Sequence, residues 1–350
     1  MSSLEIDFLA VGTGERSGDA IAIRYGDFID KQKQYVIVID GGTVDSGKEL
    51  IKLIKETYGT YYIDLIILTH PDGDHSSGLR EILRDEEFTI AKFWMHQPWE
   101  HSEEIKNLFK DGRITSTSLS ERLKDAYNFA YECEEIAKNR DIPIEEPFTG
   151  KSFNNGNITV LGPDEDYYTS LIPEFNKSPE QKTSTFSKAL TGISEAINWV
   201  IESMTIETLD ESSETSGENS SSAVILLKFA ESSYLFTADT GVDALKRVLD
   251  YADLKGINLK DIQFMQIPHH GSQRNISPSI LDAITPKYAL ASASKDAPKH
   301  PSKKVTNAYK RRGTKTYATN GTNVRVPNNA PSREGYSTMD EVPFYNQVEE

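Results

Sequence analysis

The segment LTHPDGDHSSG, residues 68–78, constrains the fold of this chain more than any other stretch. It directly follows the apolar run DLIIL and carries four potential metal ligands within six positions, namely His70, Asp72, Asp74 and His75. A turn after a strand lets closely spaced side chains converge on one point, where imidazoles and carboxylates can bind a metal ion. A polar turn that only caps a helix needs one such side chain and no flanking histidine. The segment therefore predicts a metal site at the end of a strand.

The remaining sequence alternates strand-like apolar runs with segments of helical periodicity. Strands are expected at residues 4–12, 20–26, 35–42, 62–70, 89–95, 223–229, 233–241, 261–272, 288–294 and 314–319. Helices are expected at residues 48–59, 77–85, 118–140, 242–252 and 302–313. Interleaved strands and helices predict an α/β protein built from packed layers.

Composition and the first residues predict an aqueous, reducing compartment. The sequence has no apolar run of about 18 residues that would span a bilayer. The start, MSSLEIDF, lacks the basic residues and apolar core of an export signal. A single cysteine, Cys133, excludes an intramolecular disulfide framework. We therefore expect a soluble, cytoplasmic protein with no membrane partner.

Charge is distributed unevenly along the chain. The net charge of −16 argues against extensive coating by nucleic acid, which relies on many lysine and arginine contacts to phosphates. Residues 269–330, however, hold 11 basic residues against 2 acidic ones. This basic segment fits a surface that faces phosphates, and it fits a plainly solvated helix face equally well.

Composition also suggests where the domain ends and where it is interrupted. Residues 202–222 carry acids and serines but no lysine or arginine, which is typical of a mobile insertion. We expect one domain over residues 1–330 with an acidic, serine-rich insertion at about 165–222, followed by a tail at 331–350.

Several motifs resemble one known family. THPDGDH resembles the His-x-His-x-Asp-His signature of the metallo-β-lactamase fold, in the ComEC-type variant where aspartate replaces the second histidine. FLAVGTGERSGDAIAIRYG, VIVIDGG, NSSSAVILLKF, SYLFTADTG, IPHHGS and KHPSKKVTNAYKRRGTKTYAT follow that branch in the same order. The resemblance covers most of residues 5–326, except a helical segment at about 95–150 and the insertion before residue 219.

The resemblance implies a four-layer αββα sandwich with two divalent metal ions at one edge of its sheets. By position, His70 and Asp72 would hold one ion, and Asp74 and His75 the other. Asp40 matches the aspartate that supports this ligand loop from behind.

The later ligands come from the second half of the chain. Asp239 in TADTG matches the carboxylate that bridges the two ions, although an isolated aspartate there would simply be a turn residue. His269 or His270 matches the last histidine ligand, and the sequence leaves open which of the two binds.

The chain departs from the family pattern at two points. It has no third histidine between the signature and Asp239, and Asp164 could take that place. His96 and His101 come too early in the sequence for that ligand but could still fold over the site, and whether Asp164, His96 or water completes it stays open. We expect both histidines to be pocket or surface residues. Asp72 replaces an imidazole by a harder ligand, which favours manganese or magnesium over zinc. Manganese is expected, and zinc also fits.

The implied chemistry is hydrolysis of a phosphodiester. Two ions about 3.5–4 Å apart activate a water molecule and clamp a phosphoryl group. Asp74 would orient that water or accept its proton. The spare member of the pair His269 and His270, or else His300, would protonate the leaving oxygen. His300 matches the closing His-Pro of the family and lies among lysines, although a surface histidine is an equal contender.

The resemblance favours a nuclease or phosphodiesterase acting on DNA or RNA, with single strands or ends preferred because most of the chain is acidic. The 95–150 segment would cover the substrate or dock a protein partner. Two alternatives stay open: a hydrolase of small esters, lactones or thioesters, and a subunit of a multi-protein defence complex whose activity depends on its partner.

Overall fold

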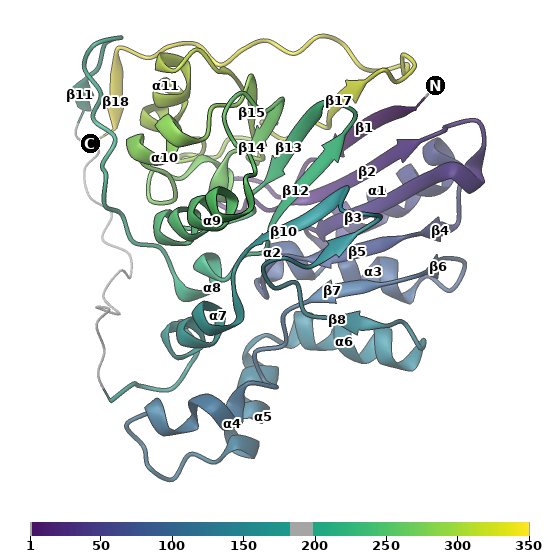
Figure 1. Ribbon diagram of the computed structural model, residues 1–350, viewed down its shortest axis with the longest axis vertical. Coiled ribbons are helices and arrows are strands. Elements are labelled where there is room, and N and C mark those ends of the chain that lie inside the picture. Colours follow the sequence, from purple (N-terminus) through teal and green to yellow (C-terminus); the bar gives the residue numbers. More distant parts are fainter. Residues whose placement is uncertain (1, 183–198, 350) are drawn as a thin grey trace.

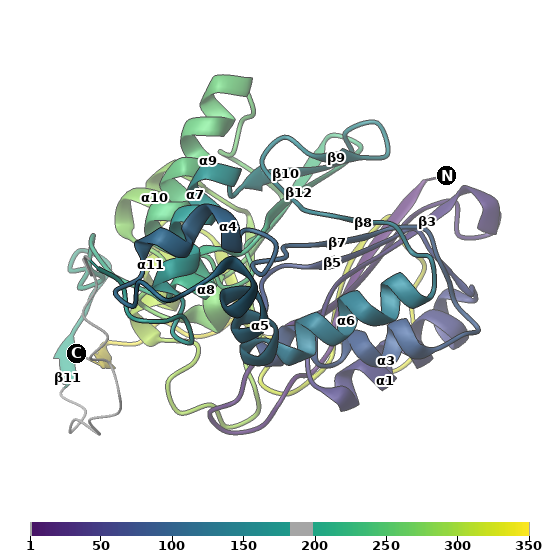
Figure 2. The ribbon, with the colours of Figure 1, turned by 90° about the horizontal axis from the view of Figure 1, so that it is seen from below.

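Two mixed β-sheets lie face to face, and helices cover the outer face of each (Figures 1 and 2). The structure is a computed structural model that describes residues 2–182 and 199–349. The first sheet has the order β17 (Val324–Asn328), β1 (Ser3–Phe8), β2 (Ala20–Gly26), β3 (Gln34–Gly41), β5 (Leu65–Leu68), β7 (Phe93–Met95), β8 (Ile144–Glu145). The second has the order β16 (Lys315–Ala318), β15 (Tyr288–Ala291), β14 (Phe264–Gln266), β13 (Ser232–Phe236), β12 (Val224–Phe229), β10 (Ile158–Gly162), β9 (Ser152–Phe153). Two short pairs, β4 (Tyr62–Ile63) with β6 (Thr89–Ile90) and β11 (Trp199–Ile201) with β18 (Gln347–Glu349), lie outside these sheets.

Each sheet has its own set of helices. The first is covered by α1 (Val44–Lys52), which continues as a π-helix over Leu53–Tyr58, and by α3 (Leu79–Arg84) and α6 (Asn128–Asn139). The second is covered by α9 (Val242–Lys255), α10 (Pro278–Ala283) and α11 (Lys303–Arg311). The other helices are α2 (Gly73–Ser76), α4 (Ser102–Ile105), α5 (Ser116–Ala126), α7 (Glu165–Leu171) and α8 (Gly217–Ser220).

Three apolar cores separate the four layers. In β3, Val36 and Val38 point to the helices of the first sheet, whereas Ile37 and Ile39 point to the second sheet. Strand side chains alternate between faces, so a strand buried on both sides has to be apolar throughout. The third core lies between the second sheet and α9, α10 and α11. This architecture confirms the predicted α/β sandwich.

The sheet topology places strand ends at one edge of the molecule. β3, β5, β7 and β8 run parallel to one another, and so do β13, β14, β15 and β16. Loops at the carboxyl ends of parallel strands meet at the same edge, which is where α/β proteins usually build their sites.

The helix expected at residues 118–140 is instead two helices, α5 and α6, that meet at Tyr127. The Tyr127 hydroxyl is buried and donates a hydrogen bond of 2.6 Å to Glu218, a residue of the distant α8. Cys133 of α6 lies against the carbonyl of Ser76 in α2. The 95–150 segment is thus built into the first sheet and its helical layer.

The acidic insertion and the tail contact the domain at several points. Glu202 is buried and accepts hydrogen bonds from Asn307 (2.7 Å) and Arg311 (2.8 Å). In the tail, Arg333 donates to Asp7 at 2.6 Å, and β18 pairs with β11. Residues 183–198 of the predicted insertion lie outside the described residues.

In the described ranges we find no helix that combines the length and the apolar character needed to cross a membrane.

Candidate metal centre

The loop after β5 is held by Asp40, the buried aspartate near the end of β3. Its carboxylate accepts hydrogen bonds from the backbone N–H (2.8 Å) and the hydroxyl (2.6 Å) of Thr69. It also lies 2.8 Å from Nδ1 of His75, in α2. Because an ionised carboxylate only accepts, His75 carries its hydrogen on Nδ1 and presents Nε2 on the other side of the ring. Asp40 thus fixes the tautomer and the ring orientation of His75.

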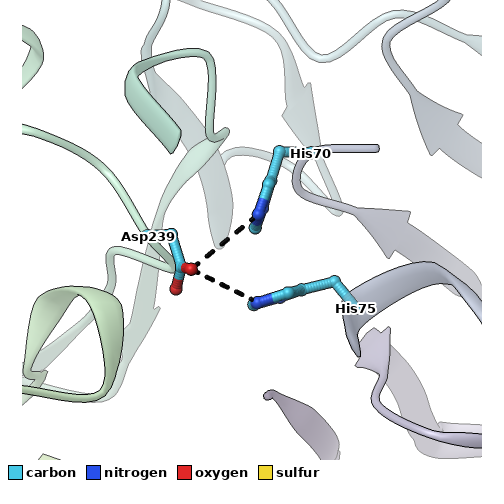
Figure 3. Close-up of side chains that lie close together, drawn as sticks. All are labelled: His70, His75 and Asp239. Carbon is cyan, nitrogen blue, oxygen red and sulfur yellow. Dashed lines mark ion pairs between the residues drawn. The ribbon is translucent and has the colours of Figure 1, made fainter. Parts of the chain in front are cut away.

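Asp239, which follows β13, lies in the middle of four histidines. Its Oδ2 is 3.9 Å from Nε2 of His70 and 3.6 Å from Nε2 of His75 (Figure 3). The same oxygen is 3.6 Å from Nε2 of His269, and Oδ1 is 3.6 Å from Nε2 of His270. Residues from both sheets therefore converge on one carboxylate.

The two adjacent histidines reach Asp239 through an unusual backbone. His269 (φ 47°, ψ 53°) and His270 (φ 56°, ψ 18°) are both left-handed. This conformation costs energy for residues other than glycine, and such residues are enriched at functional sites. Gly271 follows with φ 90°, and a Cβ there would lie 2.5 Å from the ring of Pro301. The tight turn lets both imidazoles face the carboxylate of Asp239.

Asn275 fixes the orientation of His269. Its Nδ2 donates to the carbonyls of Asp239 (2.8 Å) and Thr240 (3.2 Å), so its Oδ1 faces Nδ1 of His269 at 2.9 Å. His269 therefore donates from Nδ1, and its Nε2 presents a lone pair towards Asp239. Nδ2 of Asn219 also lies 3.2 Å from this Nδ1. Both His269 and His270 thus face Asp239, and His270 is the more deeply buried of the two.

Burial shifts the pKa values of the ring and carboxyl groups. It lowers the pKa of His70 and of His270 to about 4, which keeps both imidazoles neutral. Burial alone would raise the pKa of Asp239, but His270, His269 and His75 hold it well below its usual range. Burial, followed by the charge of Asp74, raises the pKa of Asp72 to about 6.

The donor atoms fit a divalent cation. Nε2 of His70, His75 and His270 and Oδ1 of Asp239 are buried and have no hydrogen-bond partner. Buried polar atoms are normally satisfied, so unpartnered lone pairs that converge at one point fit a cation-binding site. Among the described residues, ligand atoms lie within 4.8 Å of one another in four groups, including His70–His75–Asp239 and Asp74–His75–His270. Asp72 lies 3.8 Å from Nε2 of His70.

Three other candidates lie apart from these groups. Asp164 caps α7 by accepting from the backbone of Tyr167 (2.8 Å) and faces Arg247 at 3.7 Å. His96 is buried and stacks on the ring of Tyr168 with centroids 4.2 Å apart. His101 contacts Glu146 at 3.2 Å.

His300 lies beside the histidine pair. Its ring centroid is 5.8 Å from that of His269 and 6.4 Å from that of His270. Burial, followed by His269 and His270, lowers its pKa to about 4.

Sequence reasoning missed Asp19, the residue before β2. It is buried and belongs to two of the four groups, one with Asp40 and His75 and one with Asp239 and His270. The only sequence signal is its place in SGDAIAIRYG, where an aspartate stands between a glycine and an apolar strand.

The comparison with family models supports the same fold over part of the chain. Residues 16–149, which include all but the last residue of the 95–150 segment, match the metallo-beta-lactamase superfamily. No curated protein matches. Among solved structures, a diphosphatase from the PhnP family is 12% identical over 93% of this chain and 99% of its own, with a TM-score of 0.40.

Two further solved structures are longer than this chain. CmlA beta-hydroxylase is 10% identical over 93% of this chain but 53% of its own length, with a TM-score of 0.43. A long-form RNase Z from yeast is 9% identical over 75% of this chain and 32% of its own, with a TM-score of 0.34. The chain thus spans about half of the first and a third of the second. Two facing sheets flanked by helices, together with the superfamily match, show that this chain has the metallo-β-lactamase fold.

Proposed function

We propose that this chain is a metal-dependent hydrolase that binds two divalent cations and cleaves phosphodiester bonds, as a ComEC-type member of its fold. The observation that carries the proposal is the position of Asp239, within 3.6–3.9 Å of four histidine nitrogens from both sheets. His70, Asp72 and His269 would hold one cation, and Asp74, His75 and His270 the other, with Asp239 shared. The carboxylates make manganese the preferred ion.

Bound divalent cations would acidify water and neutralise the charge that develops on a phosphoryl group. Around them, the protein's own groups position the reactants. Asp74 lies in the group with His75 and His270 and can accept the proton that the attacking water gives up. His300 is the candidate proton donor to the leaving oxygen, because it lies beside the histidine pair without being part of the ligand groups. A substrate phosphate next to it would favour its protonated form.

The basic segment limits the size of the substrate. Four of its basic residues pair with acids elsewhere: Lys310 with Glu341, Arg311 with Glu202, Arg312 with Glu207, and Arg325 with Glu5. Lys303 packs over the ring of Trp199 at 4.4 Å, and Lys304 is buried. Lys295 and Lys299 are exposed close to His300 in the sequence. Together with Arg274, which is exposed five residues after His269, these two lysines suit a strand end or a small diester better than a long duplex.

A first experiment measures hydrolysis of bis(p-nitrophenyl) phosphate and of labelled single- and double-stranded DNA and RNA with added manganese. The double variant His70→Ala, Asp74→Ala should lose at least about 100-fold in kcat/KM, because both cation sites lose a ligand. Arg113→Ala, at an exposed pair with Asp111, is the matched control and should keep full activity. Turnover of a lactone or thioester without phosphodiester cleavage would instead support a small-ester hydrolase.

A second variant tests the proton donor. His300→Gln should reduce cleavage of a nucleotide diester by about 100-fold, since general acid catalysis contributes roughly that much or more. The same variant should cleave bis(p-nitrophenyl) phosphate almost normally, because p-nitrophenolate leaves without protonation. Equal losses on both substrates would remove this role from His300.

Dependence on a protein partner remains our second candidate. The α4–α5 part of the 95–150 segment projects from the body of the molecule, and Leu108 beside it is 48% exposed (Figure 1). Such a partner would copurify with the intact chain and raise its activity, whereas Leu108→Glu would weaken the complex.

A further inference from the structure

Asp19 occupies a buried position against the ligand loops. The residues before it pack on the loop after β15, where the Ser292 hydroxyl donates to the carbonyl of Gly18 at 2.8 Å. A Cβ on Gly18 would lie 2.2 Å from the carbonyl oxygen of Asp74, so only glycine allows this approach. Asp19 is 1% exposed and therefore belongs to the interior of the edge that carries Asp74 and His75.

One carboxylate oxygen of Asp19 is held by Gln266, the last residue of β14. The Gln266 amide oxygen accepts from the backbone N–H groups of Thr237 and Ala238, each at 3.2 Å. These two bonds fix the amide so that its nitrogen donates to Oδ2 of Asp19 at 2.7 Å. The orientation of the Asp19 carboxylate is thus set from β14, the strand that leads to His269 and His270.

The other oxygen, Oδ1, is buried and has no hydrogen-bond partner. Ligand atoms of Asp19 lie within 4.8 Å of those of Asp239 and His270, and likewise of Asp40 and His75. No lysine or arginine in the described ranges forms an ion pair with Asp19, Asp40 or Asp239. His75, with Nδ1 3.9 Å from Oδ2 of Asp19, cannot by itself compensate three buried carboxylates, so a positive ion is the natural partner for the free oxygen.

We infer that Asp19 is a further metal ligand, which binds a divalent cation through Oδ1 on the side of the centre formed by Asp239 and His270. The inference rests on the proposed two-cation centre and adds to it a carboxylate that the sequence motifs did not indicate. An added hard oxygen ligand shifts the preference of the site further towards manganese or magnesium.

The alternative is that Asp19 simply holds a proton on Oδ1. The variant Asp19→Asn distinguishes a metal-binding carboxylate from a neutral acid. Asparagine has the shape of a protonated aspartate, so it would leave metal binding unchanged if the acid were neutral. Titration of the chelator-stripped protein with MnCl2 by calorimetry should show two binding events in the wild type. In Asp19→Asn we expect one of them to weaken by about 10–100-fold.

Asp64→Asn is the matched control, because Asp64 is a half-buried carboxylate that accepts a bond from the backbone of Val36 away from the centre. Unchanged affinity of both events in Asp19→Asn would overturn the inference. If that variant does not fold, crystals of the wild type grown with MnCl2 decide: an ion about 2.2 Å from Oδ1 supports the assignment, and an ion bound elsewhere refutes it. A wild type that binds two ions but cleaves no phosphodiester would contradict the proposed function alone.

Discussion

At the scale of single residues, the centre depends on groups that fix histidine tautomers. Asp40 forces the hydrogen of His75 onto Nδ1, and Asn275 does the same for His269. In both residues Nε2 is then a free acceptor facing Asp239. A lone pair held in position before the cation arrives avoids an ordering cost on binding. The asparagine is therefore as much a part of the site as the ligands.

Asn275→Leu should weaken manganese binding by about 10–100-fold, because His269 loses the acceptor for its Nδ1 hydrogen. Asn275→Asp keeps an acceptor at that point and should recover most of the affinity. Calorimetric titration measures the binding, and ¹⁵N NMR of the histidine rings in the metal-free protein reports the tautomer directly. Asn258→Leu, at an exposed asparagine, serves as the control. An unaltered tautomer in Asn275→Leu would show that Asn275 does not set it.

At the scale of elements, the tail after residue 330 is bound to the first sheet by ion pairs. Arg333 reaches back to Asp7 (2.6 Å) and to Glu5 (2.8 Å), both buried in β1. Arg24 and Arg325 pair with the same Glu5, and the Tyr58 hydroxyl donates to Asp7. These residues come from four parts of the sequence, and each charge is compensated by a neighbour. The segment is therefore part of the domain.

Arg333→Ala should lower the free energy of unfolding by about 3 kcal/mol, because removal of one partner leaves a buried carboxylate unpaired. Urea unfolding followed by circular dichroism measures the change. The exposed pair between Arg113 and Asp111 gives the comparison, since Arg113→Ala should cost less than about 1 kcal/mol. A loss of similar size in both variants would mean that Arg333 contributes no more than a surface ion pair.

The elements also show what a sequence can and cannot predict. Strands such as β3 and β5 can be predicted because they are continuous apolar runs. The THPDGDH loop can be predicted as a metal site because it holds four potential ligands within six residues. Asp19 and Asn275 carry no such local mark, since their partners Gln266 and His269 come together with them only in the folded chain. The break at Tyr127 and the anchoring of the tail by Arg333 depend in the same way on distant acids, Glu218 and Asp7.

At the scale of the whole molecule, the centre gathers negative charge at the edge where the two sheets meet. Asp19, Asp40 and Asp239 are buried there, and Asp72 and Asp74 lie beside them. Without cations, mutual repulsion and poor solvation of these groups oppose folding. The three apolar cores hold the layers together elsewhere, so we expect the loss of metal to destabilise the fold without abolishing it.

Removal of metal by a chelator should therefore lower the melting temperature, and manganese at about 100 times its dissociation constant should add about 2.7 kcal/mol of stability. Differential scanning calorimetry of the stripped and reloaded protein checks this. Asp239→Asn, which removes the shared carboxylate, should reduce the difference between the two forms. Equal melting temperatures with and without manganese would argue against a cation at this edge.

The division of ligands between the sheets also governs how the protein matures. His70 and His75 leave the ribosome long before Asp239 and His270, and neither pair makes a complete site. A nascent chain cannot capture its ions securely until residue 270 has emerged and the second sheet has docked on the first. Metal loading of the proposed centre would consequently be one of the last steps of biogenesis, and the unfinished polypeptide would lack the proposed hydrolase activity before then.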